Sequence, residues 1–155
     1  MFEARLDELG VHLPGPFPPH DPLDAVVVHA GTARTSGCLP RTVDGVLHAT
    51  GLVGERVSVE TAVTCAELCA LNAVSLLRAA LGTLDVIDRL VTLTVFVACV
   101  GGFAEQRRVA DGASHALVRL FGDAGRHTRS AIGVAGLPRE APVEVEVTAA
   151  LRGGG

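Results

Sequence analysis

Lysine, tryptophan and tyrosine are all absent from this chain of 155 residues, and each absence narrows the possible functions. Without lysine, the chain cannot form a lysine Schiff base with a carbonyl substrate or with pyridoxal phosphate, so amine or imine chemistry must proceed without it. A formal net charge of −4 and an aromatic content of 3% leave neither a basic patch nor a platform for stacking bases. We therefore expect no nucleic-acid partner.

Metal ligands and membrane segments are also scarce. No histidine lies at a spacing that completes a metal site with the cysteines, and we expect these to be small buried side chains. No run approaches the roughly 18 uninterrupted apolar residues of a membrane helix, and the N-terminal segment carries acids where a signal peptide carries basic residues. The sequence predicts a cytoplasmic protein without a metal site or membrane contact. The four cysteines are Cys38, Cys65, Cys69 and Cys99.

The length suits one folded domain. Hydrophobic residues make up 48% of the chain and charged residues only 19%, so we expect part of the surface to face other subunits. Residues 1–22 form an N-terminal arm, with an amphipathic piece at 2–9 followed by the proline-rich run PGPFPPHDP. We assign 23–152 to the single domain and 153–155 to a flexible tail.

Hydrophobic periodicity predicts an α+β fold with two helices packed on one face of a largely antiparallel or mixed sheet. The longer helix has Ser58 as N-cap, Glu60 in its first turn and Gly82 just after its end. We expect a buried stripe on it that includes Ala80, and we place Val91 on the buried face of its strand. The expected strands are 25–31 and 33–40 as a hairpin, 45–49, 90–97, 129–134 and 143–149, and the helices are 58–81 and 103–120.

The last strand offers the first candidate for chemistry. In VEVEV, residues 143–147, the valines share one face and Glu144 and Glu146 share the other. If the last two strands form a hairpin, Arg129 lies opposite Glu144, where a guanidinium and a carboxylate can share one ligand. An ordinary cross-strand ion pair on a solvated face explains the same pattern, so the residues alone leave both interpretations open.

Several motifs resemble one known family. HTRSAIGVAGLP, residues 127–138, followed by VEVEV, is similar to the closing signature of the RidA (YjgF-type) reactive-intermediate deaminase family. TSGCLP at 35–40 and TVFV at 94–97 resemble two earlier motifs of that family, in the same order and at similar spacing. The resemblance covers about 24–151 and is greatest to a longer branch that carries an N-terminal arm.

This resemblance implies a chorismate-mutase-like fold, a homotrimer, and a ligand cleft at each subunit interface. Arg129 would hold a substrate carboxylate in a bidentate grip, and Glu144 would orient a water that hydrolyses a 2-imino acid to a keto acid and ammonia without a cofactor. The partner would be a small carboxylate-bearing metabolite. The residues bordering the pocket would be Ser36, Gly37, Cys38, Phe96, His127 and Ala131.

The sequence also departs from the family pattern. Pro22 lies near the position of a family tyrosine, Cys38 replaces a common glutamine, and Ala131 replaces a common cysteine. These changes alter the pocket wall and motivate a second hypothesis, a diverged member that tailors a biosynthetic intermediate or binds a carboxylate metabolite without deaminating it. His127 fits either an acid–base role or a place at the pocket rim. Endoribonuclease activity ranks last, given the acidic charge and the missing stacking residues.

Overall fold

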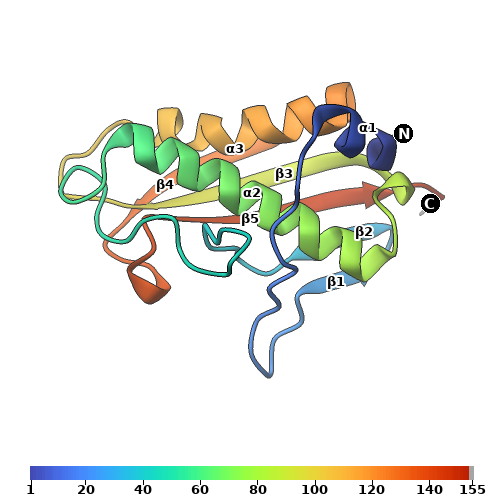
Figure 1. The fold of residues 1–155 in the computed structure, drawn as a ribbon, viewed down its shortest axis with the longest axis horizontal. Coiled ribbons are helices and arrows are strands. Elements are labelled where there is room, and N and C mark those ends of the chain that lie inside the picture. The colour runs from blue at the N-terminus through green and yellow to red at the C-terminus, as the bar shows by residue number, and fades with distance from the viewer. Residues whose placement is uncertain (154–155) are drawn as a thin grey trace.

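The computed structural model describes residues 1–153, so the last two residues of the expected tail, 154–155, lie outside it. Five strands form one sheet in the order β1-β2-β5-β3-β4, and within it only β3 and β4 run parallel (Figure 1). The elements are α1 Phe2–Leu9, β1 Val26–His29, β2 Thr32–Thr35, α2 Val59–Leu81, η1 Leu84–Val86, β3 Ile87–Ala98, α3 Gln106–Phe121, η2 Gly122–Gly125, β4 Thr128–Val134, η3 Pro138–Glu140 and β5 Val143–Leu151.

The α+β prediction is confirmed, with α2 and α3 lying together on one face of a mixed sheet (Figure 1). The predicted hairpin of the last two strands is wrong. A strand that returns parallel to its neighbour needs a long crossover, and α3 provides one between β3 and β4. The other side of β3 is occupied by β5, which runs antiparallel to it. Strands β4 and β5 therefore lie on opposite sides of β3.

Helix α2 follows its sequence signals closely. The Ser58 hydroxyl accepts a hydrogen bond from the Thr61 N–H at 3.1 Å, and Gly82 ends the helix with a φ of 79° that suits glycine. Although α2 is long and apolar enough to cross a bilayer, most of its apolar stripe is buried against the sheet, which makes it a core helix of a globular protein. The one error in the predicted stripe is Ala80, which is exposed.

Two strand predictions fail for local reasons. The expected strand at 45–49 is an irregular loop in which Leu47 forms only an isolated bridge with Arg41. In β3 the register with β5 shifts between Leu90 and Thr92, so Leu90 is buried and Val91 is 41% exposed. A bulge of this kind changes the face on which the following side chains lie, and periodicity alone does not reveal it.

The arm is fixed to the body at its N-terminal end. The rings of Phe2 and Phe121 meet edge to face at 4.8 Å, and the N–H of Phe2 donates to the Asp85 carboxylate at 2.6 Å. Glu3 accepts from the N–H of Leu84 at 2.8 Å. From α1 the chain runs across α2 and then extends below the sheet before β1 begins (Figure 1).

Candidate functional site

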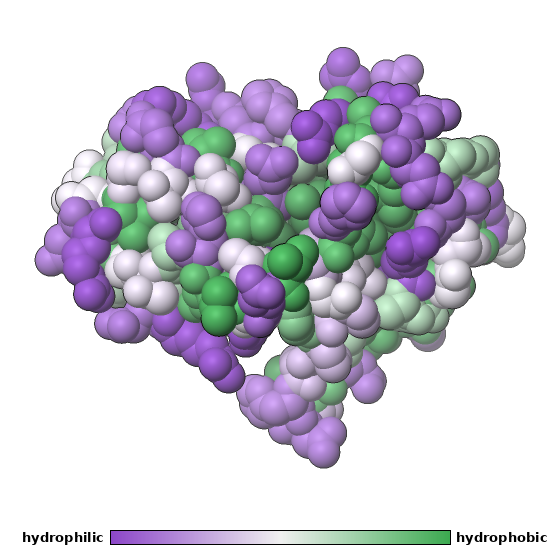
Figure 2. Space-filling view, in the orientation of Figure 1, coloured by the Kyte–Doolittle hydropathy of each residue, from purple (hydrophilic) through white to green (hydrophobic). Residues whose placement is uncertain are grey.

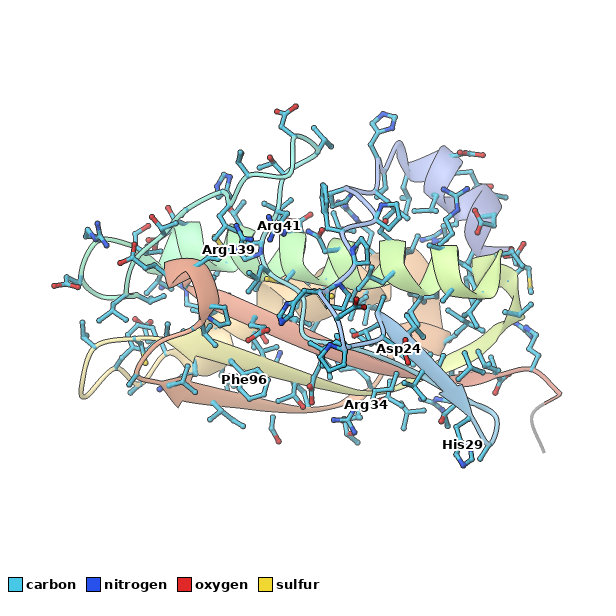
Figure 3. All side chains as sticks on the ribbon, turned by 90° about the horizontal axis from the view of Figure 1, so that it is seen from below. Asp24, His29, Arg34, Arg41, Phe96 and Arg139 are labelled. Carbon is cyan, nitrogen blue, oxygen red and sulfur yellow. The ribbon has the colours of Figure 1, made fainter. Side chains whose placement is uncertain are left out.

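Glu144 and Phe96 lie on the face of the sheet that the helices leave uncovered. Paired residues on neighbouring strands point to the same face, and Phe96 pairs with Glu144 on β5 and with Ile132 on β4. The valines at 143, 145 and 147 point the other way and are buried, as their alternation predicts. Figure 3 shows Phe96 on the lower side of the sheet, away from the helices.

The Glu144 carboxylate lies directly against the α-carbon of Gly37. A side chain at residue 37 would overlap with Oε1 of Glu144, so glycine is needed for this contact. The segment is pinned to β5 by two hydrogen bonds, from the Cys38 N–H to the Val145 carbonyl at 2.8 Å and from the Val145 N–H to the Cys38 carbonyl at 3.0 Å. Burial, and then the nearby Glu146 carboxylate, raise the pKa of Glu144 above its ordinary value.

Glu144, Ser36 and Gly37 line one cavity of about 720 Å³. The arm forms a second wall of this cavity through Phe17–His20, and η3 contributes Arg139. In Figure 2 the arm projects below the body, and a hollow lies beside it. The Ser36 hydroxyl donates to the Asp24 carbonyl at 2.6 Å, which ties the cavity floor to the end of the arm. A cleft beside a titratable group with a shifted pKa is a candidate binding site.

Arg129 lies on the opposite face of the sheet from Glu144 within one chain. It pairs with Leu93, which points into the core, and its Nη1 donates to Asp111 Oδ1 at 2.9 Å and to the Ser114 hydroxyl at 3.0 Å. The predicted position of Arg129 across from Glu144 in a hairpin is therefore wrong. The Arg129 side chain is 18% exposed, and both of its strong contacts are with α3.

His127, directly before β4, and Ala131 of β4 lie on the helix side of the sheet with Arg129. The His127 ring is held at both nitrogens, with Nδ1 2.6 Å from the Gly125 carbonyl and Nε2 2.9 Å from the Ser114 hydroxyl. Ala131 packs against the core. The structure thus brings together Ser36, Gly37 and Glu144, with Phe96 beside Glu144, and keeps the β4 group separate from them within a single chain.

The family whose description reads "YjgF/chorismate mutase-like, putative endoribonuclease" matches residues 3–151. This match spans nearly the whole chain. The chain belongs to the YjgF family. Protein TCP17 of Trypanosoma cruzi is 41% identical to it over 145 residues, which cover 92% of this chain and 89% of that protein.

Solved structures match this chain at two levels of similarity. The Agrobacterium tumefaciens protein Atu1372, of unknown function, is 39% identical, with a TM-score of 0.88 over 97% of this chain and 93% of that one. Escherichia coli TdcF with bound serine is 21% identical, with a TM-score of 0.61 over 86% and 91% of the two chains. The TdcF match shows a shared fold, whereas the Atu1372 match extends over nearly all of this chain.

Three of the four cysteines of this YjgF-family chain are buried thiols whose raised pKa makes them poor nucleophiles. Cys38 is buried directly behind Gly37, where burial raises the pKa of its thiol to about 12, and burial raises the pKa of Cys65 to about 11. The pKa of Cys69 is also raised well above its usual range by burial. Thiolates are the reactive form, so these three side chains act as small apolar packing groups. Among residues 1–153, no histidine, cysteine or acidic side chains gather into a metal-binding group.

Three contributors to the cavity are absent from the sequence prediction. The sequence indicates only an arm at Phe17–His20 and no role for Arg41 or Arg139, yet all of them line the cavity. The proline-rich composition excludes regular structure but does not indicate what the arm packs against. The sequence feature that comes closest to indicating this wall is the absence of the family tyrosine near Pro22. Where that tyrosine is missing, other residues must form this part of the cavity wall.

Proposed function

We propose that this YjgF-family chain is a hydrolase that converts a small carboxylate-bearing imine or enamine, a 2-imino acid, to a keto acid and ammonia. The observation that carries the proposal is the half-buried Glu144 carboxylate at the wall of a cavity of about 720 Å³. A carboxylate with a raised pKa is better matched to taking a proton from water near neutral pH. The serine bound to E. coli TdcF supports a ligand with a carboxylate in this fold.

In the proposed reaction Glu144 orients one water toward the imine carbon and accepts a proton from it as the carbon–oxygen bond forms. The electron pair of the C=N bond moves to the nitrogen, which takes up a proton. The hydroxyl proton of the carbinolamine is then transferred to the amino group, the carbon–nitrogen bond breaks with its electron pair on nitrogen, and ammonia leaves the keto acid behind. One water is consumed for each ammonia released, and no cofactor takes part.

Arg129 serves in this proposal as the carboxylate anchor, contributed by a neighbouring subunit. Within one chain Arg129 and Glu144 lie on opposite faces, so one ligand contacts both only if two copies meet. Strand β4 is at the edge of the sheet, and the open face exposes Val27 and Ile132 at 55% and 43%. Burial of this face between copies favours assembly, and a homotrimer gives three equivalent clefts.

The remaining predicted residues fall into two groups in such a cleft. Ser36 and Gly37 lie beside Glu144 at the floor, Cys38 packs behind them, and Phe96 forms an apolar wall on the open face. His127 and Ala131 accompany Arg129 on β4. The protein acts in the cytoplasm on a small metabolite, without nucleic acid or membrane.

The test generates an imino acid in situ from its amino acid with an amino-acid oxidase and measures ammonia and keto acid against the spontaneous rate. We expect Glu144→Gln and Arg129→Ala to lose at least about 10²-fold in kcat/KM, because each removes a group that contacts substrate or water. Glu8→Gln and Arg126→Ala are matched controls, since both residues are exposed and neither lines the cavity. An inactive wild-type protein, or full activity in Arg129→Ala, would overturn the proposal.

The second candidate is a diverged family member, either a tailoring enzyme of a biosynthetic pathway or a carboxylate-metabolite binding protein without deaminase activity. It is favoured by the replaced pocket wall, in which Phe17–His20 of the arm line the cavity. A thermal-shift panel of keto acids, amino acids and pathway intermediates separates the candidates, because a ligand that binds only the folded state raises the Tm whether or not it turns over. A binding protein gives Tm shifts without ammonia release.

A further inference from the structure

The cavity beside Glu144 contains two cationic side chains that the proposed reaction leaves unused. Arg41 follows β2 and Arg139 lies in η3, and both line the cavity although they are distant in sequence. Figure 3 labels both side chains in the same part of the view, beside the first turns of α2. Neither forms an ion pair with a carboxylate anywhere in residues 1–153.

Arg41 is half-buried and held in place while most of its donors stay available. Its Nη1 donates to the Gly45 carbonyl at 2.8 Å, and its guanidinium carbon lies 5.8 Å from the centre of the Phe17 ring. A guanidinium has five N–H donors in one plane, and the contact with the Phe17 ring helps to hold this one at the cavity wall. The arm therefore positions Arg41 as well as enclosing the cavity.

Arg139 is placed by an unusual backbone. Its φ of 57° and ψ of 25° are in the left-handed region, and Glu140 next to it also has a φ of 57°. Residues other than glycine are strained there, and such strain concentrates at functional sites. Ordinary packing does not explain the position of the side chain, because Arg139 is exposed on the rim of the cavity.

The rest of the wall near these arginines is largely apolar. Leu39, Leu76 and Pro138 contribute to it, and Pro18 and Pro19 of the arm add two further apolar groups. Arg41 and Arg139 line the same cavity, and neither is neutralised by an ion pair within the described part of the chain. One oxyanion held by both side chains supplies the missing negative charge and matches the planar donor geometry of arginine.

We propose that Arg41 and Arg139 bind a second oxyanion, a carboxylate or a phosphate, at the end of the substrate away from the reacting carbon. This inference rests on the proposed function for the position of the reacting carbon beside Glu144. It defines the substrate class as 2-imino acids that carry a second acidic group on the side chain. Phe17–His20 enclose that group and select against neutral side chains.

The experiment measures binding without turnover, by calorimetry on the intact protein with three matched probes. Pentanoate carries one carboxylate, pentanedioate carries two, and 4-phosphonobutanoate replaces the second with a phosphonate. We expect pentanedioate to bind at least about tenfold more tightly than pentanoate, because charge-assisted bidentate pairs are strong. Arg41→Met and Arg139→Met each reduce this preference, and the double variant abolishes it.

One control variant separates the effect of the cavity arginines from that of losing any positive charge. Arg119→Met removes the same charge from an exposed position on α3 outside the cavity, and it retains the preference. If the Arg41→Met protein does not fold, the Arg139→Met protein, which is changed at an exposed position, is sufficient to test the preference. Tighter binding of the phosphonate than of pentanedioate identifies the second group as a phosphate. Equal affinity for pentanoate and pentanedioate, or a preference that survives in the double variant, overturns the inference.

The two proposals fail in different ways. If the protein prefers pentanedioate but does not accelerate imino-acid hydrolysis, the hydrolase proposal is wrong and the second oxyanion site is supported. If the protein hydrolyses imino acids with neutral side chains and binds pentanoate and pentanedioate equally well, the second oxyanion site is wrong and the hydrolase proposal is supported.

Discussion

Arg129 and Asp111 form an ion pair on the helix side of the sheet, with Nη1 and Oδ1 2.9 Å apart. The Arg129 side chain is 18% exposed and the Asp111 side chain is 43% exposed, so the pair is partly screened by water. Any substrate carboxylate that binds Arg129 has to compete with Asp111 for the same guanidinium. In the proposed site, Asp111 sets how strongly Arg129 holds a ligand.

Replacing Asp111 by asparagine tests this competition. Asp111→Asn keeps an oxygen acceptor near Arg129 but removes the negative charge, so we expect KM for a carboxylate substrate to fall severalfold while kcat changes little. Steady-state kinetics with the in situ imino acid measure both. Asp123→Asn, at the fully exposed pair with Arg126, is the control and leaves KM unchanged. An unchanged KM in Asp111→Asn means that Arg129 only anchors α3.

Gly37→Ala tests the contact between Gly37 and the Glu144 carboxylate. The new methyl group would overlap with Oε1, and because that atom ends a flexible side chain, the carboxylate moves while the fold is kept. We expect kcat/KM to fall by about 10²-fold, the size typical of a catalytic group displaced by about 1 Å. The free energy of unfolding should change by less than about 1 kcal/mol. Gly101→Ala has open space around it and should change neither quantity.

The pH dependence should report the environment of Glu144. Burial and the Glu146 carboxylate raise its pKa, so the base form is lost at a higher pH than for an ordinary glutamate. The acid limb of kcat/KM should therefore lie above the ordinary glutamate range, and Glu146→Gln should move it to lower pH by removing a like charge. A carbon-13 NMR titration of the side-chain carboxyls, assigned with Glu144→Gln, measures the same pKa directly. A limb that stays in place in Glu146→Gln contradicts the assignment of Glu144 as the base.

The sequence was most informative where local pattern decides structure. Alternation in VEVEV predicted which face Glu144 occupies, and Ser58 and Gly82 predicted the ends of α2, because side-chain periodicity and capping depend on neighbouring residues. The strand order was not accessible in the same way. The hairpin prediction paired adjacent strands in the chain, whereas the α3 crossover moved β4 to the far side of β3 and placed Arg129 on the helix side.

The sequence does not predict the cavity, because its wall comes from segments that only the tertiary fold brings together. Phe17 belongs to the arm, Arg41 to the loop after β2 and Arg139 to η3, and none of them lies in a motif that indicates the others. The small-residue stripe of α2 did predict close packing of that helix. It did not reveal that Gly112 of α3 lies directly against the main chain of Val63.

Gly112→Ala tests that helix–helix contact, because helix propensity and packing predict changes of opposite sign in the free energy of unfolding. Helix propensity alone favours alanine over glycine by about 1 kcal/mol. A methyl group at 112, however, would overlap with the Val63 carbonyl oxygen, a main-chain atom of α2 that yields only if the helices separate. We expect a net loss of roughly 1–3 kcal/mol in the free energy of unfolding, the usual cost of overpacking, measured by urea denaturation. The matched variant His115→Ala, at an exposed position of α3, reports propensity without packing and should be neutral or slightly stabilising. If Gly112→Ala stabilises the protein as His115→Ala does, the close approach of α2 and α3 is not a constraint on the fold.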